Sequence, residues 1–282
     1  MTEPVIIGEH RYSASPQPED FVLHTHDTYE ILCFLSGNAE YVVEGHVYPL
    51  RRGDLMLMCR SETHRLAVRS AVPYERMTVS FSASALTPEE RQRLLQPLFE
   101  ERPLGRFNRY EAALFPDRRW DYYIRRICEV GTPEERRYYL LPLLYELTEA
   151  SGTVRQSASP PAGGAAEIAA YINRHLFEEL SLSRIGEHFY LSRSQLNRVF
   201  RRQIGSSVWE YVTVKRLFAA KAMLAAGEAP TRVAEACGFR EYTAFFRAYK
   251  RHFGVSPQQD RSPSKAAETP PSSFSRRGLH NG

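Results

Sequence analysis

The chain has 282 residues, which is enough for one large domain or two ordinary ones with sizeable cores. Its 43% hydrophobic and 25% charged residues are normal for a globular protein. The net charge of +4 is uneven, because residues 181–255 carry 13 Lys or Arg against five Glu, a net charge of +8, and the remainder sums to −4. This asymmetry predicts that one part of the chain meets a polyanion.

Membrane and secreted classes are not favoured. No apolar run approaches the roughly 20 residues of a membrane helix, and the start "MTEPVIIGEH" lacks the basic segment and apolar core of a secretory signal. The four cysteines are far apart and form no CxxC motif, so we interpret them as small buried hydrophobic residues. We therefore expect a protein of the reducing cytoplasm with no membrane partner.

Composition divides the chain into five segments. The stretch "SGTVRQSASPPAGGAA" is rich in Ser, Pro, Gly and Ala and predicts a linker, and the polar end of the chain has little to bury. We expect a β-rich domain at 1–86, a helical packing or dimerisation region at 87–150, the linker at 151–166, a helical domain at 167–261 and a disordered tail at 262–282.

The first of these segments has the pattern of β-structure. Short runs of β-branched, aromatic and aliphatic residues occupy 21–37, 39–58 and 75–82, with turns expected at Gly37, Gly45 and Gly53. Repeated short strands with glycine turns indicate a sandwich or barrel. Helical signals begin at Thr87 and Pro88, and Thr132, Pro133 and Glu135 predict a second capped helix start. The whole chain is therefore expected to be an α+β protein of two domains.

The second part contains an internal repeat. Residues 182–207 resemble residues 230–256: Ile185 matches Val233 at an offset of 48, and Leu196 matches Phe245 at an offset of 49. Each copy predicts a short helix, a turn and a longer helix that stops at a glycine, and one long helix joins the copies. This arrangement is typical of two helix-turn-helix units, whose second helix enters the major groove of DNA.

In both units the longer helix alternates apolar and basic residues. The stretch "GFREYTAFFRAYKRHFGVSP" interleaves Phe and Tyr with Lys and Arg before its Gly-Val-Ser-Pro end. Helical spacing places the apolar residues on a packed face and leaves most of the basic residues for nucleic acid. The packed faces are expected to consist of Leu196, Val199, Phe200 and Ile204 in the first unit, and of Phe245, Tyr249 and Phe253 in the second.

With its "LSRSQLNRVFRRQIG", "RLFAAKAML" and "YKRHFGVSP" stretches, the region from Leu180 to Arg261 resembles the AraC/XylS family of bacterial transcription regulators. The resemblance implies seven helices and two recognition helices in successive major grooves, roughly 34 Å apart. It places base contacts at Asn197, Arg198, Tyr242, Thr243 and Arg247, with Ser194 at a further position. Phosphate contacts are expected at Arg193, Arg201, Arg202 and Lys250, since basic side chains on phosphates position a domain without reading sequence.

The amino-terminal part resembles the cupins, which are double-stranded β-barrels. The resemblance rests on the spacing H-x-H-x3-E-x6-G, which begins at His24, and on the later Pro49, Gly53 and His64. Even separations place residues of a strand on one face. One interpretation is a transition-metal site of three histidines and one carboxylate, made by His24, His26, Glu30 and His64. The interpretation that we prefer is a pocket, with Tyr41 added, for a small polar ligand such as a sugar, without a cofactor.

These features favour a regulator over an enzyme. We expect a homodimeric activator that binds double-stranded operator DNA, contacts RNA polymerase and responds to a small effector. The effector would change how the barrel, the helices of residues 117–150 and an amino-terminal arm of residues 8–20 pack. The alternative is a metal-dependent cupin enzyme, such as an isomerase or a dioxygenase, that carries a DNA-binding appendage.

Overall fold

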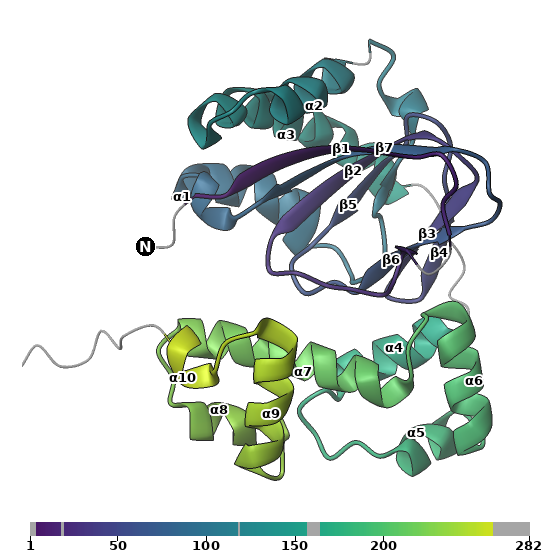
Figure 1. The fold of residues 1–282 in the computed structure, drawn as a ribbon, viewed down its shortest axis with the longest axis vertical. Helices are drawn as coiled ribbons and strands as arrows, with labels where there is room; N and C mark the ends of the chain where they lie inside the picture. The colour runs from purple at the N-terminus through teal and green to yellow at the C-terminus, as the bar shows by residue number, and fades with distance from the viewer. Residues whose placement is uncertain (1–3, 18–19, 118, 157–163, 262–282) are drawn as a thin grey trace, which may run out of the picture. The chain divides into compact units, whose positions relative to one another are not determined.

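The computed structural model describes residues 4–17, 20–117, 119–156 and 164–261. The chain divides into two compact units, Met1–Phe218 and Ala219–Gly282. The first unit begins with a β-rich domain and continues into helices, and the described residues of the second unit are helical (Figure 1). The expected α+β class is confirmed.

Eight strands form two antiparallel sheets in the described part of the first unit. The five-stranded sheet has the order β1-β7-β2-β5-β8, and the three-stranded sheet has the order β4-β3-β6. The strands are β1 (Ile6–Ser13), β2 (Tyr29–Ser36), β3 (Ala39–Val43), β4 (His46–Pro49), β5 (Leu55–Met58), β6 (His64–Val68), β7 (Tyr74–Phe81) and β8 (Arg109–Tyr110). The expected turns at Gly37, Gly45 and Gly53 are present, each with positive φ, at 127°, 83° and 87°.

Alternation along β2 separates two cores. Ile31 and Cys33 pack in a cluster with residues of the helices, whereas Leu32 and Phe34 pack in a second cluster with residues of the three-stranded sheet. Successive side chains of a strand point to opposite faces, so one strand supplies both cores. The second cluster fills the space between the two sheets, and the candidate cavity described below lies beside it.

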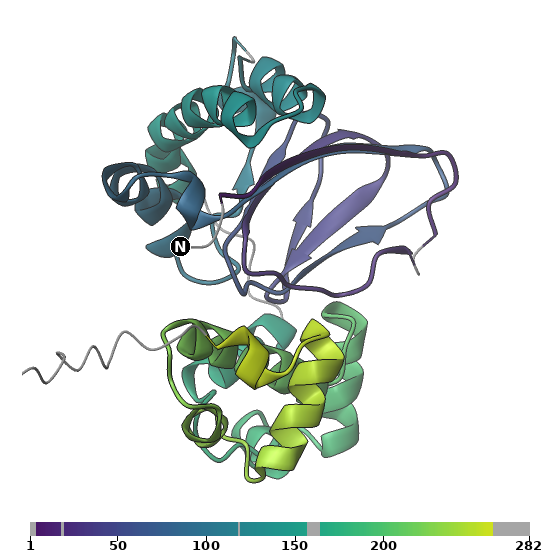
Figure 2. The ribbon, with the colours of Figure 1, turned by 60° about the vertical axis from the view of Figure 1, so that its left-hand side comes forward.

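Helices cover the outer face of the five-stranded sheet (Figure 2). A Cβ atom on Gly8 of β1 would lie 2.6 Å from the carbonyl oxygen of Ile127, so a glycine is needed for the close packing of α2 on β1. Thr87 and Thr132 both form the expected capping contacts with the glutamates three residues later. The helical elements of this region are η2 (Ala83–Ala85), α1 (Pro88–Glu90), the π-helical η3 (Arg91–Glu100), η4 (Ala112–Leu114), α2 (Arg119–Glu129) and α3 (Pro133–Gln156).

The secondary structure differs from the expectations for two segments that flank this domain. Residues 8–13 of the expected arm belong to β1, which pairs with β7 from Ile6 opposite Phe81 to Ser13 opposite Tyr74. Its polar edge-strand sequence carries no strand signal, because the pairing with a distant strand decides its conformation. The expected linker is helical at both ends, since α3 continues to Gln156 and α4 begins at Gly164. The middle of the linker and the expected tail lie outside the described residues.

Seven helices follow in residues 164–261. They are α4 (Gly164–Arg174), α5 (Leu182–His188), α6 (Arg193–Gln203), α7 (Val208–Ala225), α8 (Pro230–Ala236), α9 (Tyr242–Phe253) and α10 (Pro257–Asp260). The pairs α5–α6 and α8–α9 are the two predicted short-then-long repeats. Ser192 caps α6 with a reciprocal hydrogen-bond pair to Gln195. The last helical turn of α9 ends at Gly254 in the left-handed conformation, with φ of 76°, which glycine adopts without steric cost.

Candidate ligand cavity and nucleic-acid interface

Three histidines meet inside the β-rich domain. His24 and His64 exchange backbone hydrogen bonds of 3.1 and 3.0 Å, and their ring centroids are 4.4 Å apart. The ring of His26 lies 4.9 Å from that of His64. The structure thus brings the predicted histidines together, but not on one strand, because β2 begins only at Tyr29 and His24 forms an isolated bridge. The expectation that even spacing on a strand unites them was wrong.

Backbone carbonyls fix the orientation of all three rings. The Nδ1 atoms of His24, His26 and His64 lie 3.0, 2.9 and 2.8 Å from the carbonyl oxygens of Val22, Thr28 and Glu62. A carbonyl can only accept, so each Nδ1 carries a proton and each Nε2 is the atom that remains for a ligand or a second proton. Such bonds to the remote nitrogen are typical of histidines that bind a metal or a ligand.

The charges of the cluster are set by burial and by Glu30. Burial lowers the pKa of His64 to about 4, so this ring is neutral at pH 7, and its buried Nε2 has no partner among the described residues. Although burial alone would raise it, the pKa of Glu30 falls to about 2, because His26 hydrogen-bonds its carboxylate and the histidines surround it. The His26–Glu30 distance is 3.2 Å, and despite burial the pKa of His26 is raised by this partner.

The same donor set passes a fit test for a metal ion. One ligand atom each from His26, Glu30 and His64 lie within 4.8 Å of one another. Imidazole nitrogen and carboxylate oxygen are common ligands of transition metals. The lone pair at Nε2 of the neutral His64 faces no protein donor in the described part of the chain. These three residues therefore could hold a divalent ion.

A cavity of about 300 Å³ opens beside the cluster. Of the predicted pocket residues, His24, Glu30 and Tyr41 line it, whereas His26 and His64 contact these residues from outside the lining. The hydroxyl of Tyr41 donates to Glu30 Oε1 at 3.5 Å. Sequence reasoning missed the polar lining residues of two further strands, which are Glu9, Arg11, Arg76, Thr78 and Ser80.

A signal for this missing wall was present in the sequence. Arg76, Thr78 and Ser80 alternate on β7 with Met77, Val79 and Phe81, which are buried on the helix side. A strand whose one face is apolar and whose other face is polar usually turns the polar face to solvent. Here the polar face turns into the cavity between the sheets. The sequence shows the alternation, but it does not show that the polar face lines a cavity instead of meeting solvent.

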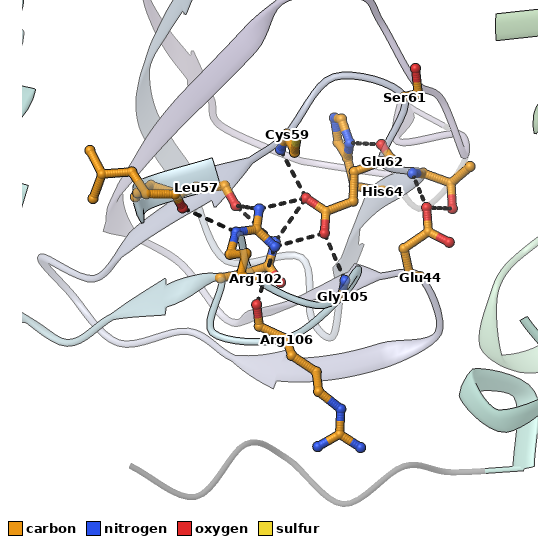
Figure 3. Close-up of polar contacts among 12 residues, drawn as sticks. Glu44, Leu57, Cys59, Ser61, Glu62, His64, Arg102, Gly105 and Arg106 are labelled. Carbon is orange, nitrogen blue, oxygen red and sulfur yellow. Dashed lines mark hydrogen bonds and ion pairs between the residues drawn. The ribbon is translucent and has the colours of Figure 1, made fainter. Parts of the chain in front are cut away.

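A buried ion pair holds the loop that carries His64. Arg102 and Glu62 form two hydrogen bonds of 2.8 and 2.7 Å, and both side chains are almost completely buried. The carboxylate also accepts from the backbone N–H groups of Cys59 and Gly105, at 2.8 and 2.7 Å (Figure 3). Burial opposes ionisation, but Arg102 and the backbone donors keep the pKa of Glu62 below its usual value. Because the carbonyl of Glu62 binds the His64 ring, this network orients that ring.

A second buried carboxylate, Glu44, lies at the β3–β4 turn. Its Oε1 accepts from the backbone N–H of Thr63 at 2.6 Å and from Nζ of Lys215 at 3.0 Å. Its Oε2 accepts from Nδ2 of Asn173 at 3.0 Å and from the hydroxyl of Tyr211. Glu44 thus joins the turn and the loop before β6 to helices α4 and α7, all within the first unit.

Residues 63–65 face two ways. His64 turns toward the cavity cluster, whereas Thr63 bonds to Glu44. Arg65 donates to the carbonyl of Ile204 at 2.8 Å and to that of Gln203 at 3.2 Å, at the carboxyl end of α6. Alternation on β6 therefore connects the cavity and the end of a recognition helix through adjacent residues.

Both recognition helices present basic residues outward. In α6, Leu196 and Phe200 are fully buried, and in α9, Phe245 and Tyr249 are fully buried. Most of the rings thus pack inward, as predicted. The predicted contact residues that lie exposed are Arg193, Ser194, Arg198, Arg201 and Arg202 on α6, and Tyr242, Thr243, Arg247 and Lys250 on α9.

Asn197 differs from the other predicted contacts. It is half-buried, and its Oδ1 accepts the backbone N–H of Val208 at 3.2 Å, at the first residue of α7. Its Nδ2 donates to the carbonyl of Arg193 at 3.3 Å. Both ends of the amide are engaged, which gives Asn197 a role in orienting α7. One N–H of the amide and one lone pair of its oxygen remain for a base contact.

Comparisons with known proteins agree with this division. An AraC-like ligand binding domain matches residues 7–119, and a helix-turn-helix domain matches residues 185–262. The chain therefore contains an AraC-like ligand binding domain followed by a helix-turn-helix domain. Among the residues that the structure describes, no helix is long and apolar enough to cross a membrane.

Three curated relatives illustrate the range of similarity. The probable transcriptional regulator LumQ of Photobacterium leiognathi is 35% identical over 88 residues, which is 31% of this chain and 36% of LumQ. The arabinose operon regulatory protein of Escherichia coli K12 is 30% identical over 143 residues, 49% of each chain. The activator RhaS of Escherichia fergusonii is 22% identical over 253 residues, 86% of this chain and 87% of RhaS. The chain thus spans about a third to a half of the length of the first two.

Proposed function

We propose that the protein is a sequence-specific DNA-binding transcription regulator whose operator affinity depends on a small polar molecule in the barrel cavity. The observation that carries this proposal is the two-way contact of residues 63–65. His64 belongs to the cavity cluster, and Arg65 binds the carboxyl end of the recognition helix α6. A ligand that moves His64 would therefore act on α6 without a long pathway.

The DNA-binding half of the proposal rests on charge and exposure. Arg198 and Arg247 are exposed on helices whose opposite faces are buried, and arginine pairs bidentately with guanine in the major groove. Operator sequences can be selected from random duplex DNA with the full chain. Arg247→Ala should cost about 1–3 kcal/mol on the selected site and relax preference at one position, whereas Lys250→Ala should weaken all sequences about equally.

Salt provides a further test of this half. Each neutralised phosphate releases counterions, so affinity should fall steeply as the salt concentration rises. An affinity that is flat between low and physiological salt would contradict DNA binding by the basic faces of α6 and α9.

Effector control is tested with Glu30→Ala and Arg65→Ala. Glu30→Ala should abolish the change in operator affinity on adding effector, typically about 1–3 kcal/mol of coupling. Arg65→Ala should reduce this coupling while effector binding persists. Lys250→Ala is the matched control, because it should lower affinity with and without effector equally. A full effector response in Glu30→Ala would place the sensor elsewhere.

The proposal includes the finer expectations for this family resemblance: a homodimer in the cytoplasm that activates transcription through contact with RNA polymerase. Sedimentation at micromolar concentration tests the dimer. In vitro transcription from a selected promoter, with and without effector, tests activation.

A metal-dependent activity is the second candidate, favoured by the ligand atoms of His26, Glu30 and His64, which lie within 4.8 Å of one another. The chain's own residues would hold the ion through His26, Glu30 and His64, and the ion would act as a Lewis acid. Elemental analysis of the purified protein and of His64→Gln separates the two candidates. A stoichiometric metal that is lost in His64→Gln supports metal binding, and turnover assays then test for an enzyme.

A further inference from the structure

Arg76 lines the cavity with an incomplete set of hydrogen-bond partners. Its buried Nε has no hydrogen-bond partner among the described residues. One hydrogen bond is present there, from Nη1 to the hydroxyl of Tyr74 at 3.5 Å, and the guanidinium lies over the same ring at 5.8 Å. No carboxylate oxygen of the described residues lies within 4.0 Å of a guanidinium nitrogen of Arg76, the distance that defines an ion pair. Burial removes water from the guanidinium of Arg76. The long hydrogen bond to Tyr74 and the contact with its ring replace only part of the lost hydration.

Three acidic residues line the cavity, and each has a partner other than Arg76. The exposed Asp20 accepts the backbone N–H of Gln17 at 3.0 Å. Glu30 is bound by His26 at 3.2 Å, and Glu9 is bound by Arg11 at 2.8 Å. Arg11 stands directly opposite Arg76 in the β1–β7 pairing, so a second cation faces the same side of the sheet. The wall formed by β1 and β7 is therefore short of negative charge beside Arg76.

The surroundings of Arg76 also define the rest of a ligand. Phe21, Leu32 and Leu66 supply apolar lining to the same cavity, and Tyr41 and Thr78 supply hydroxyl groups. A volume of about 300 Å³ is at the small end of ligand sites. The cavity is thus suited to a compact molecule with an apolar body and one anionic end.

We propose that the effector is a small organic acid, whose carboxylate pairs with Arg76 and whose apolar body lies against Leu32 and Leu66. This inference rests on the proposed function of the cavity as an effector site and narrows its ligand class. A planar guanidinium presents paired donors that match the two oxygens of a carboxylate. A neutral sugar would offer hydroxyl groups but would leave Arg76 without a directly paired carboxylate.

Matched acids and amides test the proposal on the full chain. The probes are benzoate, cinnamate and hexanoate, each beside its primary amide, with L-arabinose as a neutral polyol. Thermal unfolding and titration calorimetry are measured at constant pH and ionic strength. At least one acid should raise the unfolding temperature while its amide does not. Arg76→Met should weaken binding of that acid about 10- to 100-fold, as expected for loss of a charge-assisted hydrogen-bond pair.

Two further variants separate pairing from general effects. Arg76→Lys keeps the charge without the paired geometry, so it should bind the acid with intermediate affinity. Arg52→Met changes the net charge equally at an exposed turn position outside the lining, so it should bind like the wild type. Equal binding by acid and amide, unchanged affinity in Arg76→Met, or no binding of any acid would each overturn the proposal.

Ligand binding and operator affinity are measured separately, so the ligand class and effector control can fail independently. If an acid binds through Arg76 but leaves operator affinity unchanged, the ligand class stands and effector control fails. If a neutral molecule such as L-arabinose binds and changes operator affinity, effector control is supported and the proposal of an organic acid is contradicted.

Discussion

Arg102 and Arg76 both place a guanidinium inside the β-rich domain, and their surroundings are opposite. Arg102 is fully buried, and it binds both oxygens of Glu62 as well as the carbonyls of Leu57 and Leu98. Arg76 is half-buried, has one long hydrogen bond to Tyr74, and has an Nε atom with no partner in the described part of the chain. The protein supplies a carboxylate and several carbonyl groups to the guanidinium of Arg102, whereas the guanidinium of Arg76 has few partners.

The difference separates structural charges from binding charges. A buried charge with all its partners fixes the geometry around it, here the loop that presents His64. A buried charge without them destabilises the fold unless something outside the chain completes it. The stabilities of variants at these positions test whether the two arginines differ in this way.

The largest loss of stability is expected for Arg102→Met. Removing the guanidinium leaves the fully buried carboxylate of Glu62 without its cation, and breaking a buried pair this way typically costs about 3–5 kcal/mol. Chemical denaturation followed by circular dichroism measures the loss. The double variant Arg102→Met with Glu62→Leu is the control, and it should recover part of the loss because no charge stays buried. A loss below about 1 kcal/mol for Arg102→Met would contradict a structural role.

A smaller loss is expected for Lys215→Met. Glu44 keeps its hydrogen bonds from Thr63, Asn173 and Tyr211, so the carboxylate is not left alone. Lys215 also donates to the carbonyl of Ser61 at 2.8 Å. We expect the free energy of unfolding of the first unit to fall by about 1.5–3 kcal/mol, the usual range for a hydrogen bond that involves a charged group. Lys215→Arg should lose less. A loss as large as that of Arg102→Met would show that the remaining donors do not compensate.

Without ligand, Arg76→Met should hardly change stability. The substitution removes a poorly paired charge and keeps an unbranched side chain of similar length, so we expect a change within about 1 kcal/mol, on the stabilising side. The measurement is the same denaturation in the absence of organic acids. Destabilisation of several kcal/mol would mean that Arg76 is a structural charge like Arg102, and the comparison would fail.

The smallest effect is expected for Arg11→Met. Arg11 is the partner of Arg76 in the strand register, yet its side chain is 61% exposed and pairs with Glu9 at the surface. Exposed ion pairs contribute about 0–1 kcal/mol, so stability should change by less than about 0.5 kcal/mol. The contrast between two arginines on neighbouring strands tests whether burial, rather than position in the sheet, decides the effect.

Local signals predicted much of the architecture. Caps at Thr87 and Thr132, turns at Gly37 and Gly53 and the two short-then-long helix pairs all depend on neighbouring residues. The strand β1 was missed, because polar edge residues such as His10 and Arg11 form a strand only through their pairing with β7. Helical ends inside the expected linker were missed for a related reason, since composition averages over residues that individually continue a helix.

The candidate cavity was predicted less completely than the recognition helices. The histidine motif identified His24, Glu30 and Tyr41, but the opposite wall with Arg76 was not found. On α6, the sequence placed Asn197 among the base contacts, and its bond to Val208 is a contact across a turn that periodicity does not describe.

The order of residues is enough to predict which residues of a helix or strand share a face. Periods of two and 3.6 residues follow from backbone geometry, so the order of residues alone sorts the rings from the charges on α6 and α9. Which inward-facing charges find partners depends on how distant segments pack. Glu62 and Arg102 are 40 residues apart in sequence and 2.7 Å apart in space, while Arg76 has no such carboxylate among the described residues. Hydrogen bonds and ion pairs form only over a few ångströms, and the packing of distant segments alone brings their atoms within that range.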